Sequence, residues 1–172
     1  MKRGIFTFYN LSLDPDIVRL QAEVVKKFNT TADFLPLCSQ THGEEVIHPD
    51  AVDYGFNQLF VEQKYDTVLL LDVDCIPLNA YALEYTFEQA EKREIDVEMY
   101  QPTHFQRRPK NGVWDLGKGR GEWGIGTTYS NHLGVEMFYH LFSAREQIYN
   151  VYFYDKCEEI LGINRFKGSY KV

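Results

Sequence analysis

The sequence lacks three features that would each assign a class of protein. No apolar run approaches the ~20 residues that a membrane-spanning helix needs, and the first apolar stretch is too short for a signal peptide. The three cysteines are far apart with no Cys-x-x-Cys pair, so neither a zinc knuckle nor a disulfide framework is expected. A net charge of −7 disfavours nucleic-acid binding. We therefore expect a cytoplasmic protein without a membrane span.

What the sequence does contain is a strand–helix alternation over its first hundred residues. A chain of 172 residues with 44% hydrophobic content suits one folded domain, residues 1–172. The expected elements are a strand at Gly4–Tyr9, a helix from Asp14-Pro15, a strand at Ala32–Cys38, a helix from Pro49, an apolar strand at Asp66–Asp72, a helix from Asn79 and a strand at Val97–Phe105. The alternation predicts an α/β fold with a mostly parallel central sheet and flanking helices. Pro36 suggests that its strand lies at an edge or ends early.

Two acidic residues follow the most apolar of these strands. Asp72 and Asp74 come directly after Val68–Leu71, an unbroken apolar run typical of a strand in the middle of a sheet. If the strand stays extended, residues i and i+2 point the same way, so the carboxylates would converge. A divalent cation would relieve their repulsion, and hard oxygen ligands favour Mg²⁺ or Mn²⁺. The alternative is that both residues cap the next helix or lie in a solvated turn.

Two families carry an Asp-x-Asp motif of this kind. The haloacid dehalogenase-like phosphatases place it on the first strand and follow it with Thr or Val, where this chain has Ile76 after two strand–helix units. The segment DVDCIPL and its place after those units resemble the GT-A type of nucleotide-sugar glycosyltransferase more closely. The resemblance covers about residues 4–105. A non-catalytic nucleotide-binding module on the same scaffold stays open as an alternative.

The GT-A resemblance implies a Rossmann-like fold and a site for a nucleotide-sugar donor, with the acceptor unknown. Asp72 would lie near the ribose or the metal, and Asp74 would ligate Mn²⁺ or Mg²⁺ bridging the diphosphate. The end of the first strand, at Phe8, Tyr9 and Asn10, would lie near the base and ribose. The family often adds a late histidine ligand. His132, in a polar segment, is preferred over His140, whose MFYHLF context is typical of a core.

Further site candidates lie in the second half of the chain. An inverting transferase needs a base to deprotonate the acceptor hydroxyl, and the carboxylates proposed for it are Asp155, Glu158 and Glu122. The alternative for the first two is a solvated helix face. Basic groups that could hold diphosphate oxygens are His104, Arg107 and Arg108, unless they form only a solvated loop.

The chain is short for such a transferase. We expect residues 1–105 to form the nucleotide-binding part, and residues 106–172 to supply a glycine-rich lid loop and the acceptor side. Three possibilities stay open. The acceptor site is minimal, or a partner chain or a second copy completes it, or the protein binds nucleotides without transferring sugar.

Overall fold

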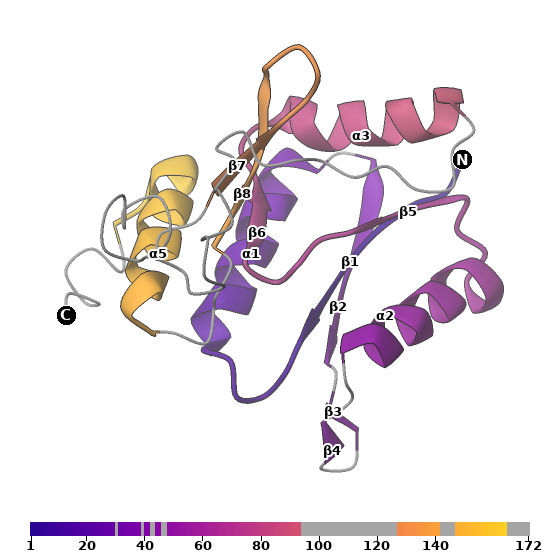
Figure 1. The fold of residues 1–172 in the computed structure, drawn as a ribbon, viewed down its shortest axis with the longest axis horizontal. Coiled ribbons are helices and arrows are strands. Elements are labelled where there is room, and N and C mark those ends of the chain that lie inside the picture. Colours follow the sequence, from indigo (N-terminus) through magenta and orange to yellow (C-terminus); the bar gives the residue numbers. More distant parts are fainter. Residues whose placement is uncertain are drawn as a thin grey trace, which may run out of the picture.

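The computed structural model describes residues 1–29, 31–38, 40–41, 44–45, 48–93, 127–141 and 147–164. Helices and strands alternate along this part of the chain (Figure 1). The elements are β1 (Arg3–Tyr9), α1 (Pro15–Phe28), β2 (Ala32–Cys38), β3 (Gln40–Thr41), β4 (Glu44–Glu45), α2 (His48–Phe56), the π-helix η1 (Asn57–Glu62), β5 (Thr67–Leu70), β6 (Cys75–Pro77), α3 (Ala80–Arg93), β7 (Thr127–Ser130), β8 (Glu136–His140) and α5 (Gln147–Leu161). No helix in these ranges combines the length and apolar character that crossing a bilayer requires.

The strands form one parallel sheet and two small antiparallel sheets. Among the described strands the parallel sheet has the order β2-β1-β5, in which β2 has the edge position expected from Pro36 and continues past it to Cys38. Within the described residues β5 lies at the other edge and β1 in the middle, whereas the apolar run of β5 suggested a central strand. The strands β6, β8 and β7 form an antiparallel sheet, and β3 pairs with β4. The parallel arrangement expected for the whole sheet is therefore shown for three strands.

The strand β1 is buried on both faces because its side chains alternate between two cores. Ile5 packs in a cluster with Val25 of α1 and Phe87 of α3. Phe6 packs on the opposite side with Leu59 of η1 and with Tyr65. Helices α1 and α3 therefore contribute to the core on one side of β1, and α2 and η1 lie on the other (Figure 1).

Helix α1 forms where the sequence predicts it. The Asp14 carboxylate accepts a hydrogen bond from the Asp16 backbone N at 3.0 Å, and Pro15 occupies the first turn. Ile17, Leu20 and Val24 repeat at helical spacing and are fully buried. They pack against α5, which lies along the outer side of α1 (Figure 1). The apolar face of α1 is thus buried in one cluster with α5 and with Ile76 of β6.

The segment after Phe56 differs from the expected regular helix. The apolar spacing predicts an α-helix from Pro49 through Phe60, but α2 ends at Phe56 and the chain continues as the π-helix η1. The wider π turn keeps Leu59 in the core beside Phe6, and the Leu59 carbonyl accepts a hydrogen bond from the Tyr65 backbone N at 2.9 Å. A change of helix geometry of this kind leaves little trace in apolar periodicity.

Candidate metal centre

Asp72 and Asp74 lie in a tight turn between β5 and β6. The Leu71 backbone N still donates to the Phe6 carbonyl at 3.0 Å, but the Asp72 carbonyl accepts from the Cys75 backbone N at 2.9 Å, which closes a four-residue turn. The strand expected to reach Asp72 ends at Leu70, so the condition that it stays extended is not met, and the turn brings the carboxylates together instead. The alternative of a solvated turn holds for Asp72, whose side chain is 48% exposed, but not for Asp74 at 8%.

Neither aspartate caps the following helix. Asn79 does so, because its Oδ1 accepts from the Ala82 backbone N at 2.9 Å, and its Nδ2 donates to the Glu136 carbonyl at 3.0 Å. The expected helix start at Asn79 is thus confirmed. Helix capping therefore does not account for the two carboxylates.

The imidazole of His140 faces both carboxylates. Its Nε2 lies 3.0 Å from Asp74 Oδ1 and 3.4 Å from Asp72 Oδ2. The cause is strand register: β8 runs antiparallel to β6 and places His140 opposite Cys75, the residue after Asp74. The Leu141 backbone N also donates to the Asp74 carbonyl at 3.0 Å, which ties the end of β8 to the turn. One ligand atom from each of these three residues lies within 4.8 Å of the others.

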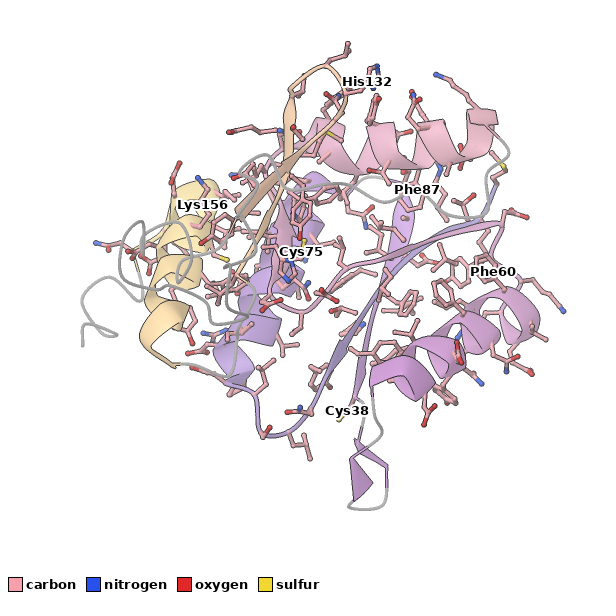
Figure 2. All side chains as sticks on the ribbon, in the orientation of Figure 1. Cys38, Phe60, Cys75, Phe87, His132 and Lys156 are labelled. Atoms are coloured by element: carbon pink, nitrogen blue, oxygen red, sulfur yellow. The ribbon has the colours of Figure 1, made fainter. Side chains whose placement is uncertain are left out.

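The preference for His132 over His140 is corrected by this geometry. His132 lies in the turn between β7 and β8, and its Nδ1 is 3.1 Å from the Tyr85 hydroxyl of α3. Figure 2 shows His132 at the far tip of this hairpin, well separated from Cys75. Since a strand rises ~3.4 Å per residue, the four steps from Glu136 to His140 alone span ~14 Å. His140 is the last residue of a strand rich in apolar residues, and Asp72 follows such a strand. The position of a polar residue at the end of an apolar strand is the feature of the sequence that could have identified His140.

The electrostatics of the site favour a cation. Burial alone would lower the pKa of His140, but the hydrogen bond to Asp74 and the charges of Asp74 and Asp72 outweigh it and raise the pKa. Burial first, and then the negative charges of Asp72 and Asp74, raise the pKa of Tyr129 to about 12. Positive charge is thus stabilised here and negative charge is opposed. A metal ion would take the place that the imidazolium proton fills.

A cavity of about 250 Å³ opens beside the three ligands. Its walls are Phe8, Leu70, Leu71, Asp72, Val73, Asp74 and His140. It therefore lies past the carboxyl ends of β1 and β5, where ligands bind in open parallel sheets. Phe8 lies in this wall, and its place near the base and ribose stays a prediction. Tyr9 and Asn10 are not part of it, and the Asn10 side chain accepts hydrogen bonds from the backbone N and Oγ of Ser12 instead.

The two described candidates for a catalytic base lie on α5. Asp155 is exposed, and Glu158 is buried beside Cys157, whose pKa is raised by burial first and then by the charges of Glu158 and Glu23. Neither belongs to the group formed by Asp72, Asp74 and His140. The other candidates from the sequence lie outside the described residues: Glu122, His104, Arg107 and Arg108.

The donor set defines which ions suit the site. Carboxylate oxygens favour Mg²⁺ and Mn²⁺, whereas an imidazole nitrogen is a ligand of first-row transition ions. Three protein ligands leave positions of an octahedral ion free for water or phosphate oxygens, and the cavity adjoins them. The residues therefore fit Mn²⁺ well and Mg²⁺ less well. Comparison of the chain with protein-family models, with curated proteins and with solved structures found no match.

Proposed function

We propose that the chain is a GT-A type glycosyltransferase that holds Mn²⁺ or Mg²⁺ through Asp72, Asp74 and His140 and uses a nucleotide-sugar donor. The observation that carries the proposal is the meeting of these three side chains at a cavity past the carboxyl ends of two parallel strands. The resemblance of DVDCIPL to the family motif supports the same reading. The proposal also implies that the parallel sheet β2-β1-β5 belongs to a Rossmann-like fold.

The division of labour between the residues follows from their exposure. Buried Asp74 and the largely buried His140 would anchor the ion, while exposed Asp72 would ligate it from the solvent side and meet the donor. The bound ion would supply a Lewis acid that stabilises charge developing on the departing nucleoside diphosphate. Phe8 offers an apolar wall to the base or the ribose. Positively charged Arg107 and Arg108 stay predicted contacts of the diphosphate.

The proposal is tested by calorimetric titration of UDP- and GDP-sugars with and without Mn²⁺. The parent protein should bind at least one donor only when the metal is present. Asp74→Asn keeps the size of the side chain but removes its charge, and it should abolish this metal-dependent binding. The matched control is Asp50→Asn, at an exposed aspartate in the first turn of α2. Metal-independent binding, or equal behaviour of Asp74→Asn and the parent, would contradict the proposal.

A non-catalytic nucleotide-binding module is the second candidate. The observation that favours it is the place of Asp155 and Glu158 on α5, outside the metal-ligand group of the described residues. The two candidates differ in turnover. A transferase should hydrolyse the bound donor slowly and release nucleoside diphosphate in an Mn²⁺-dependent reaction that Asp74→Asn abolishes, whereas a binding module should bind the donor and release none.

A further inference from the structure

The turn that carries the aspartates is bound from behind by one buried side chain. Gln21 lies in the middle of α1 and is fully buried. Its Nε2 donates to the Asp72 carbonyl at 2.7 Å and to the Cys75 carbonyl at 2.8 Å. These carbonyls belong to the first and last residues of the turn. One amide group therefore spans the whole turn and ties it to the central helix.

The hydrogen bonds from Gln21 restrain the turn that carries the two carboxylates. Backbone pairing also holds the turn: Cys75 N bonds Asp72 O within it, Leu141 N bonds Asp74 O from β8, and Cys75 pairs with His140 in the β6–β8 ladder. Two like charges on a turn repel each other, and a less restrained turn would relax to separate them. Groups behind a metal ligand that fix its orientation commonly change metal affinity 10–100-fold when removed.

We propose that Gln21 is a positioning residue of the metal centre, which holds the Asp72–Cys75 turn in its ion-binding shape. This rests on the proposed binding of a divalent ion by Asp72, Asp74 and His140. In an ordinary structural role Gln21 would only join α1 to the sheet. In the proposed role its two hydrogen bonds keep the carboxylates within reach of one ion before that ion arrives, so that binding needs little rearrangement.

The test compares two variants of α1. Gln21→Met keeps the length of the side chain and removes both N–H donors, while Val24→Ala, one turn further along the helix, creates a cavity and leaves both hydrogen bonds to the turn in place. We expect Gln21→Met to bind Mn²⁺ about 10–100-fold more weakly than the parent by calorimetry, and Val24→Ala to bind it as the parent does. The electron paramagnetic resonance spectrum of bound Mn²⁺ should change in Gln21→Met only.

A second variant covers the case in which Gln21→Met does not fold. Gln21→His keeps one ring N–H donor at about the same reach, and it should show an intermediate loss of affinity. Parent-like affinity in Gln21→Met or Gln21→His, or an equal loss in Val24→Ala, would overturn the role of Gln21 while leaving metal binding intact. A parent protein that binds no Mn²⁺ or Mg²⁺ would overturn both this inference and the proposed function.

A separate observation concerns the imidazole ligand. The Tyr129 hydroxyl lies 3.0 Å from His140 Nδ1, and the two rings stack with centroids 5.9 Å apart. With an ion bound, Nε2 would offer its lone pair to that ion, so Nδ1 would carry the ring proton and donate it to the Tyr129 oxygen. We infer that Tyr129 is a positioning residue that fixes the orientation of His140 toward the metal.

The chain supplies a matched control for Tyr129. Tyr85 makes the same kind of contact, hydroxyl to Nδ1 at 3.1 Å, with His132, which is outside the metal-ligand group. Tyr129→Phe should weaken Mn²⁺ binding about 10–100-fold and alter the nitrogen coupling of bound Mn²⁺ in pulsed paramagnetic resonance. Tyr85→Phe should do neither. Equal effects of the two variants, or none from Tyr129→Phe in a protein that binds Mn²⁺, would overturn the inference.

Discussion

Raising the pH of the metal-free protein is expected to weaken its fold through His140. The hydrogen bond from Nε2 to Asp74, helped by the charge of Asp72, raises the pKa of His140 in the folded chain although burial acts the other way. In the unfolded chain a histidine titrates near ~6.5. The stabilising contribution of the imidazolium is therefore complete below about pH 6.5 and is lost as the pH rises through the folded-state pKa.

The size of this effect follows from a single proton. Between the two pKa values the folded state binds at most one proton more than the unfolded state at this site, so the slope is at most ~1.4 kcal/mol per pH unit. For a chain of 172 residues each kcal/mol shifts Tm by ~2–4 °C, which gives up to ~3–6 °C per pH unit. Mn²⁺ affinity should move the opposite way and rise up to ~tenfold per unit, because the metal displaces that proton.

Urea unfolding in the presence of a chelator, at intervals between about pH 6 and 8.5, measures how the free energy of unfolding of the metal-free protein changes with pH. The parent slope minus the His140→Gln slope isolates the imidazole, since the other histidines titrate in both proteins. His132→Gln is the control, as its ring is bonded to Tyr85 rather than to a carboxylate. Equal slopes for the parent and His140→Gln, or parent stability that rises with pH relative to that variant, would refute the reasoning.

Three further predictions concern the rest of the described chain. Gly55→Ala should lower Tm, because the added Cβ would lie 2.6 Å from Phe8 Cζ; overpacking costs ~1–3 kcal/mol and exceeds the ~1 kcal/mol gained in helix propensity, so a higher Tm would contradict it. Arg3→Met should cost ~2 kcal/mol in urea unfolding, because it leaves the largely buried Glu91 carboxylate without its two 2.7 Å hydrogen bonds, and an unchanged midpoint would contradict this. Of the three cysteines only half-buried Cys38 should react with a thiol reagent in the folded protein, counted by mass spectrometry, and rapid labelling of a second one would contradict the burial.

Much of the first half of the fold could be predicted from local signals. Asp14 and Pro15 begin α1, Asn79 begins α3, and Ala32–Cys38 forms an edge strand as Pro36 indicates. Each of these features depends on backbone chemistry within a few residues of the chain. The same holds for the aspartate pair, whose residue types alone indicate a cation.

The arrangement around that pair could not be predicted locally. Whether Asp72 and Asp74 follow an extended strand or a turn depends on hydrogen bonds from Gln21, which is 51 residues from Asp72. The choice between His132 and His140 depends on the register of β8 against β6, and two residues of the apolar context of His140, Met137 and Phe138, do lie in the core. Apolar periodicity contains no register information between distant strands.

The sequence by itself determined that a charged motif follows an apolar strand within a strand–helix alternation, because periodicity and capping act between neighbouring residues. Only the tertiary structure decided which histidine lies beside the two aspartates and which buried group hydrogen-bonds their turn. Those contacts join β8, α1 and the turn across 50 or more residues. Their energies exist only once the packing of these elements has brought the groups within hydrogen-bond distance.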